Sequence, residues 1–173
     1  MKKESNFIIT IFILTFILSI CFSTVSNIMA ASFNDIVLFI IMVAVISIGI
    51  LFDAIGTAGI TAKEATFHSM SSAKVKGAKE ALTLIKSGSK ISSICNDVIG
   101  DVCGIVSGGL GAVLAMSLST NFGINNTIIS VVLSAFISSF TVGGKAIMKN
   151  VAMRKADQII HTVGKVKHFL RIK

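Results

Sequence analysis

Four charged side chains stand inside or at the edges of long apolar stretches of this sequence, and they are the residues best placed to do chemistry. They are Asp53, Asp97, Asp101 and Lys145. A charged group within a membrane span costs at least ~2.5 to 3.5 kcal/mol on insertion scales, so it ordinarily persists where it pairs or binds something. Asp97 and Asp101 are four residues apart and therefore share a helix face, with Asn96 beside them.

These side chains allow two kinds of site. Clustered carboxylate and amide oxygens suit a hard cation such as Mg²⁺, and a threonine hydroxyl from a facing helix can help. In the other interpretation, Asp97 or Asp101 forms an ion pair with Lys145 that neutralises both charges and locks two helices together. The sequence favours neither site over the other. The candidate cation ligands are Asp53, Thr61, Asn96, Asp97 and Asp101, with Thr57 as an alternative to Thr61.

Motifs of enzyme active sites are absent from the sequence. It contains no nucleotide-binding glycine loop, no HExxH motif and no grouping of serine, histidine and aspartate that a set of spans could assemble. Cys21, Cys95 and Cys103 lack metal-ligand spacing, and the three histidines stand apart from one another. We therefore expect no enzymatic activity, and no cofactor other than a transported or bound Mg²⁺ ion.

The elements that must position the charged residues are membrane spans. Hydrophobic residues make up 53% of the chain and charged residues only 14%, with a mean hydropathy of +0.88, which is more apolar than a soluble core needs. Crossing the hydrocarbon layer takes roughly 20 apolar residues. The candidate runs are 7–23, 36–52 with a continuation to 61, 91–118 and 127–148. We predict an all-α fold, a polytopic membrane helical bundle of three or four transmembrane helices.

The first run also has the basic start of a secretory signal peptide. A cut near Ala30 would place Ile28 or Met29 where a small residue is expected, so we favour a retained helix. Residues 1–30 then form an N-terminal transmembrane helix, and residues 31–173 form one transmembrane domain.

Basic residues alternate along the chain in a way that predicts its topology. The segments 62–90 and 149–173 are rich in lysine and arginine, whereas 24–35 and 119–126 contain neither. Short basic loops stay in the cytoplasm, so four spans place both termini there, and three spans keep the same sidedness if the first run is cleaved. The net charge of +8 could in principle indicate a nucleic-acid partner, but the basic residues lie between and after apolar runs. This placement predicts a multi-pass protein of the cell membrane, and we expect no nucleic-acid partner.

The two basic segments carry helical apolar faces. Residues 62–90 predict a cytoplasmic helical hairpin, broken around Ser71-Ser72, whose apolar face is Val75, Ala78, Leu82 and Ile85. Residues 149–173 predict a juxtamembrane amphipathic helix with the stripe Ala152, Ala156, Ile159, Ile160, Val163, Val166 and Leu170. This helix suits an anionic surface of membrane lipids, and docking on a cytoplasmic protein partner is the alternative.

A glycine strip marks the third run. Gly100, Gly104 and Gly108 recur every fourth residue, so one side of this helix is bare backbone that another helix can approach closely. We expect a homodimer through this face. Asp97 and Asp101 neighbour the strip on the helical wheel, so we expect both to point into protein and away from lipid.

The order of these features resembles the transmembrane domain of the CorC and cyclin M (CNNM) family of magnesium exporters, over residues 36–170. The family's S-A-x-E-x-A type motif is matched in position by Thr61-Ala62-Lys63-Glu64-Ala65-Thr66, and its second hairpin helix by residues 76–85. Gly100-Asp101 is the nearest equivalent of its Gly-Asn motif. Residues 144–152, beginning Gly144-Lys145, occupy the place of its G-E-x-x-P-K-type motif.

The resemblance implies that polar groups from three motifs strip a magnesium ion of water and coordinate it between helices, with transport by alternating access. Carried over by position, Thr61, Asp101 and Lys145 stand for the family's serine, asparagine and glutamate. Lysine thus replaces an anionic ligand, the motif proline is missing, and we expect no CBS domains after Lys173. The chain is similar to a degenerate member of the family.

Three functions remain open at this point. The leading one is binding or transport of Mg²⁺. The alternative is a non-transporting membrane anchor or regulatory subunit, in which Lys145 closes the old ion site by pairing with an aspartate. A pore-forming, holin-like protein is the third, because such proteins are also small, helical and basic at the tail.

Overall fold

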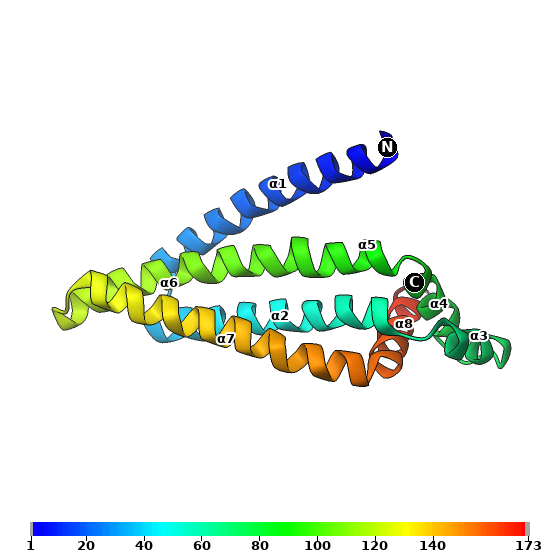
Figure 1. The fold of residues 1–173 in the computed structure, drawn as a ribbon. Coiled ribbons are helices and arrows are strands. Elements are labelled where there is room, and N and C mark those ends of the chain that lie inside the picture. Colours follow the sequence, from blue (N-terminus) through cyan, green and yellow to red (C-terminus); the bar gives the residue numbers. More distant parts are fainter. Residues whose placement is uncertain (1, 172–173) are drawn as a thin grey trace. The chain divides into compact units, whose positions relative to one another are not determined.

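A computed structural model describes residues 2–171 and shows an all-α protein, which confirms the predicted fold class; the described residues include no strand (Figure 1). The helices in chain order are α1 (Lys2–Ser32), α2 (Asp35–Thr61), α3 (Glu64–Ser72), α4 (Ala78–Lys86), α5 (Gly88–Ser92), the π-helix η1 (Ser93–Ile99), α6 (Gly100–Phe122), α7 (Asn126–Arg154) and α8 (Ala156–Arg171).

Four helical segments of the described chain are long and apolar enough to cross a membrane, by length and composition. They are Ile8–Ile28, Asp35–Thr61, Gly88–Phe122 and Asn126–Arg154. The third segment joins α5, η1 and α6 without a break. The helical segment that contains the predicted apolar run 91–118 therefore begins three residues before that run, at Gly88.

The chain divides into two compact units. The first combines Met1–Gly49 with Val98–Gly144, and the second combines Ile50–Asp97 with Lys145–Lys173. Helices α2, η1 and α7 contribute residues to both units. The expected division into residues 1–30 and 31–173 remains a prediction.

Small residues let the helices of the first unit approach closely. Helix α1 packs against α6. A Cβ added at Gly49 of α2 would lie 2.9 Å from the Cβ of Cys103 in α6, and one at Gly111 would collide with the Ile137 side chain of α7. Such close backbone approach is typical of helices packed within membranes. The core side chains of this unit include Leu38, Met42, Ile46, Leu110 and Leu114.

A polar contact links two helices at one end of this unit. Asp35, in the first turn of α2, accepts hydrogen bonds from the Ser117 hydroxyl at 2.6 Å and from the Asn121 amide at 3.1 Å, both in α6. The carboxylate near a helix N-terminus also interacts favourably with the helix dipole. The pair Asp35–Ser117 was not foreseen from the sequence, because the two residues are 82 positions apart.

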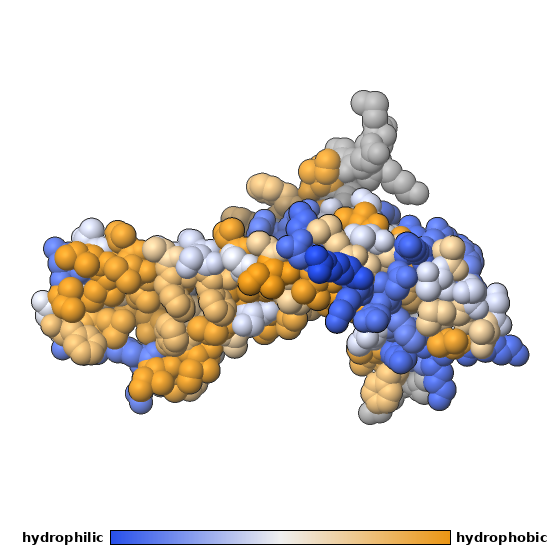
Figure 2. All heavy atoms as spheres, turned by 60° about the horizontal axis from the view of Figure 1, so that its bottom comes forward, coloured by the Kyte–Doolittle hydropathy of each residue, from blue (hydrophilic) through white to orange (hydrophobic). Residues whose placement is uncertain are grey.

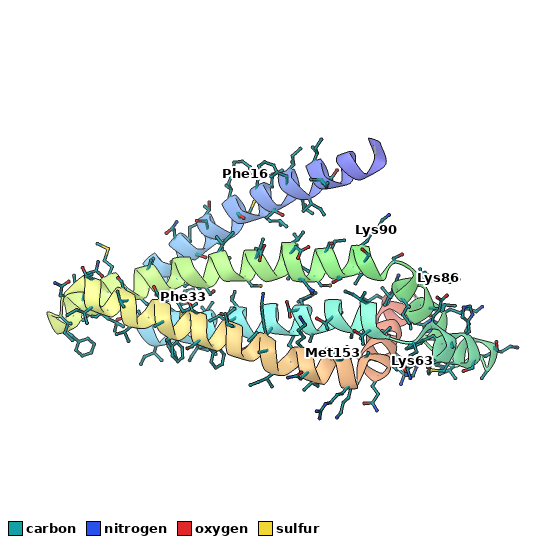
Figure 3. The ribbon with its side chains drawn as sticks, in the orientation of Figure 1. Phe16, Phe33, Lys63, Lys86, Lys90 and Met153 are labelled. Carbon is teal, nitrogen blue, oxygen red and sulfur yellow. The ribbon has the colours of Figure 1, made fainter. Side chains whose placement is uncertain are left out.

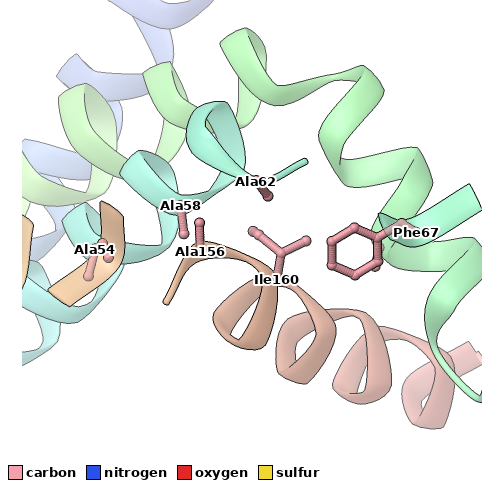
Figure 4. Close-up of a cluster of buried hydrophobic side chains, with 8 residues drawn as sticks. Ala54, Ala58, Ala62, Phe67, Ala156 and Ile160 are labelled. Atoms are coloured by element: carbon pink, nitrogen blue, oxygen red, sulfur yellow. The ribbon is translucent and has the colours of Figure 1, made fainter. Parts of the chain in front are cut away.

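Helices α3, α4 and α8 pack together in the second unit around a core built largely of alanine. Ala54 and Ala58 lie on one face of α2, and Ala62, the first residue after this helix, continues the same spacing. Ile160 of α8 and Phe67 of α3 point toward each other beside this face (Figure 4). The fully buried residues of the cluster also include Ala81 and Ala152. Methyl groups fill little space, so the helix backbones come close together.

A glycine contact closes this core. The chain turns between α3 and α4 at residues 73–77, just after the expected break, and Gly77 adopts a left-handed φ of 82°. Gly77 also lies against Gly164 of α8, where an added Cβ on either glycine would collide with the backbone of the other segment. No other residue type satisfies both demands at position 77.

The apolar stripe expected along residues 152–170 is only partly buried. Its first part, including Ala156 and Ile160, belongs to the core, whereas Val166 is 55% and Leu170 is 70% exposed. The reason is tertiary: α4 contacts the side of α8 that carries Gly164 and His168, whereas Val166 and Leu170 lie on another side of that helix. Hydrophilic side chains gather over α3, α4 and α8 in Figure 2, whereas hydrophobic ones cover much of the spans.

Candidate functional site

The charged pair within the apolar helices is Asp53 with Lys145. The Lys145 Nζ of α7 lies 3.7 Å from Asp53 Oδ1 of α2, within the second unit, and the two side chains are 30% and 15% exposed respectively. Sequence reasoning expected Lys145 to pair with Asp97 or Asp101, so the ion pair was foreseen but its partner was wrong. Each charge reduces the cost of holding the other away from water.

A buried amide oxygen faces α2 from the π-helix. The Asn96 side-chain nitrogen donates a hydrogen bond to the Ser92 hydroxyl at 3.2 Å. Its Oδ1 atom is buried and finds no partner among the described residues. Gly56 makes room for it, because a Cβ at this position of α2 would collide with the Asn96 amide. A buried acceptor without a donor is uncommon, and such an oxygen is a ligand that hard cations accept.

Asp97 lies within the π-helix η1. Seven residues, Ser93–Ile99, follow an i→i+5 hydrogen-bond pattern, so each turn holds more residues than an α-helix and the side chains rotate out of the 3.6-residue register. Asp97 is exposed, as are Asp101, Gly104 and Gly108, which follow it at helical spacing. Single π-turns occur frequently at functional sites. The composition of this segment does not distinguish a π-helix from an α-helix, so the π-helix was not predictable from the sequence.

Asp101 does not complete the expected carboxylate cluster. It is exposed and belongs to the first unit, at the start of α6, whereas Asp53, Asn96 and Asp97 belong to the second. The expectation that Asp97 and Asp101 both point into protein is wrong within a single chain. Over the described part of the chain, neither carboxylate forms an ion pair.

The two threonines have different surroundings. Thr57 is buried in α2. Thr61 is exposed at the end of the same helix, where its hydroxyl donates a hydrogen bond to the Thr57 carbonyl at 2.8 Å. This bond uses the hydroxyl proton and leaves the Thr61 oxygen able to accept or to act as a ligand. Among the side chains that the structure describes, no group of three or more His, Cys, Asp or Glu could hold a metal ion.

Sequence reasoning missed a polar junction at the far end of α2. Asp157, in the first turn of α8, accepts hydrogen bonds from the Lys63 backbone N–H at 2.9 Å and from the Thr66 hydroxyl at 3.2 Å. It therefore caps the start of α3 from a distant segment, in place of a local capping residue. The residues are more than 90 positions apart, so only the folded chain brings them together.

Two histidines that stand alone in the sequence join α8 to α4 and the turn before it. His168 Nδ1 lies 3.0 Å from Glu80 Oε1, and His161 Nε2 lies 3.2 Å from the Lys76 carbonyl oxygen. These contacts hold α8 against the hairpin beside the Gly77–Gly164 contact.

Comparisons of this chain with protein-family models, with curated proteins and with solved structures find no match. The resemblance to the CorC and cyclin M family rests on the sequence motifs and remains a prediction.

Proposed function

We propose that this protein is a multi-pass protein of the cell membrane that does not transport ions, and that it serves as a membrane anchor or regulatory subunit. The observation that supports this function is the Asp53–Lys145 pair. Lys145 places an ammonium group at the position where the resembled transporters carry an anionic ligand. In this function, the unit formed around α3, α4 and α8 is the surface that contacts other molecules, and both chain termini lie in the cytoplasm.

Electrostatics argue against a second cation beside this pair. Two unit charges about 4 Å apart interact by about 4 kcal/mol at an effective dielectric constant of about 20, and a divalent ion by about twice that. A Mg²⁺ ion that bound Asp53 would meet this repulsion from Lys145. The ammonium would have to move away before the ion could bind.

Magnesium flux tests this proposal. The purified full chain is reconstituted in proteoliposomes that enclose a magnesium dye, and Mg²⁺ is added outside. We expect no flux above that of protein-free liposomes. Saturable flux that Asp53→Asn abolishes would overturn the proposal.

A double-mutant cycle tests the pair itself. We expect Asp53→Asn or Lys145→Gln alone to lower the free energy of unfolding by about 1–3 kcal/mol, because each leaves one charge uncompensated in a part-buried site. The double variant should recover part of this loss. Lys149→Gln is the matched control, because Lys149 is exposed one turn further along α7. Additive losses in the double variant would show that the two charges do not interact.

A specific observation favours divalent cation transport as the second candidate function. The unpartnered Oδ1 of Asn96 faces α2 in the same unit as Asp53 and Thr57, and these groups together supply oxygen ligands. In this case proteoliposomes that contain the wild-type protein would take up Mg²⁺, and Asn96→Ala would abolish the flux. Asp97→Asn, which changes an exposed neighbour in the same π-helix, should leave the flux unchanged.

A further inference from the structure

A cleft of about 300 Å³ lies in the second unit where two helix junctions meet. One wall is the end of α2 and the start of the following turn, with Thr61 and Lys63. The other wall is the junction between α7 and α8, residues 153–158. Figure 3 labels Lys63 and Met153, one residue from each wall.

Positive charge dominates this cleft. Lys63, Arg154 and Lys155 line it and are exposed, and none of them forms an ion pair within the described chain. The cleft contains a single carboxylate, Asp157, and both of its oxygens accept hydrogen bonds from the start of α3. Three cations and one carboxylate leave a formal charge of +2. The first turn of α8, which also lines the cleft, adds the partial positive charge of a helix N-terminus.

The cations lie at the ends of two candidate spans. The apolar segment of α2 ends at Thr61, two residues before Lys63, and that of α7 ends at Arg154 itself. Two residues correspond to at most about 7 Å of chain. In a bilayer, lysine and arginine at span ends reach the headgroup layer, where lipid phosphates lie. The position of the cleft in the chain therefore places its cations at phosphate depth.

We propose that this cleft binds the phosphate group of an anionic phospholipid from the leaflet at this end of the spans. Arg154 offers a planar fork suited to two phosphate oxygens, and Lys63 and Lys155 supply point charges on either side. Met153 and Ala156 provide apolar contact for the glycerol part of the lipid. A lipid bound here bridges α2–α3 and α7–α8. The inference does not depend on whether the protein transports ions.

Native mass spectrometry of the full chain in a mild detergent tests this site, with dihexanoyl phosphatidylglycerol as the probe. We expect phosphatidylglycerol to bind more tightly than phosphatidylcholine of the same chain length. Arg154→Gln with Lys155→Gln should weaken phosphatidylglycerol binding by about fivefold for each charge removed, or about 25-fold together. Arg154→Lys, which keeps the charge, should lose less affinity for phosphatidylglycerol than Arg154→Gln.

The matched control removes two charges elsewhere on the same unit. Lys79→Gln with Lys90→Gln changes two exposed lysines outside the cleft. An equal loss in this control and in the cleft variant would overturn the proposal, because binding would then follow net charge alone. Equal binding of phosphatidylcholine would also overturn it. Inorganic phosphate that binds as tightly as phosphatidylglycerol, and with the same dependence on Arg154, would assign the cleft to a soluble phosphate compound and refute a lipid site.

Discussion

Replacement of Gly164 by alanine should loosen α8 from α4. An added Cβ at this position would collide with the carbonyl oxygen of Gly77 and lie 2.9 Å from the Cβ of Ala81. Both obstacles are backbone or Cβ atoms, which cannot rotate away as the end of a long side chain can. Helix α8 would therefore have to shift, and Ile160 would be drawn out of the alanine-lined core.

Two opposing effects set the magnitude of this change. Overpacking a close contact costs about 1–3 kcal/mol. Alanine in place of glycine inside a helix stabilises the helix by up to about 1 kcal/mol through its higher helix propensity. The clash involves backbone that has little freedom to move, so we expect a net loss of about 1–2 kcal/mol in the local free energy of unfolding. This corresponds to a factor of roughly 5 to 30 in the opening equilibrium.

Hydrogen exchange of the full chain in detergent micelles measures this opening. The Ala81 N–H, which donates to the Gly77 carbonyl oxygen at 2.9 Å, should exchange roughly 5 to 30 times faster in Gly164→Ala. Gly143→Ala in α7 is the matched control, because an added Cβ there meets nothing within 4 Å. If exchange in α4 is as slow in Gly164→Ala as in the wild type, then the two glycines are not in contact and the packing argument is refuted.

Three further substitutions follow from the same contacts. Gly77→Ala should lower the free energy of unfolding by about 1 kcal/mol more than Gly164→Ala, because its φ of 82° adds backbone strain; thermal unfolding in detergent would reveal the difference, and equal losses would contradict it. Asp157→Ala should cost about 1–2 kcal/mol in the same assay, because the start of α3 loses two hydrogen bonds, whereas Gln158→Ala should change little. Gly108→Leu should abolish cross-linking between copies if the glycine strip forms the expected homodimer; undiminished cross-linking would place the interface elsewhere.

The spans were predictable because their signal is long and redundant. About twenty apolar residues are needed to cross a bilayer, so a few polar positions, such as Asp53, do not hide the pattern. The end of α2 at Thr61 was also predicted, because a basic segment follows it. The exposure of Asp97 was not predictable, because the sequence does not show which face of the third span its neighbours leave uncovered; Asp101, Gly104 and Gly108 share this exposed face.

The partner of Lys145 could not be predicted from the sequence, for a different reason. The prediction named Asp97 or Asp101, but Asp53 also lies in an apolar run, and the choice among the three carboxylates depends on which helices pack side by side at that depth. For the amphipathic stripe of the tail, the part that is buried was likewise not predictable from the sequence. Helical periodicity identifies the apolar face of α8, but only the folded structure shows that α4 contacts the side that carries Gly164 and His168.

The pairing of Asp53 with Lys145 also determines how this part of the protein responds to the membrane potential. A single charge that crosses the whole membrane gains or loses about 2.3 kcal/mol per 100 mV. The two groups are opposite in sign and only 3.7 Å apart, so the voltage pulls them in opposite directions with almost no net force. A movement of α2 together with α7 that keeps the pair intact therefore does almost no electrical work. Removal of either partner would leave a lone charge in the field and make the same movement sensitive to voltage.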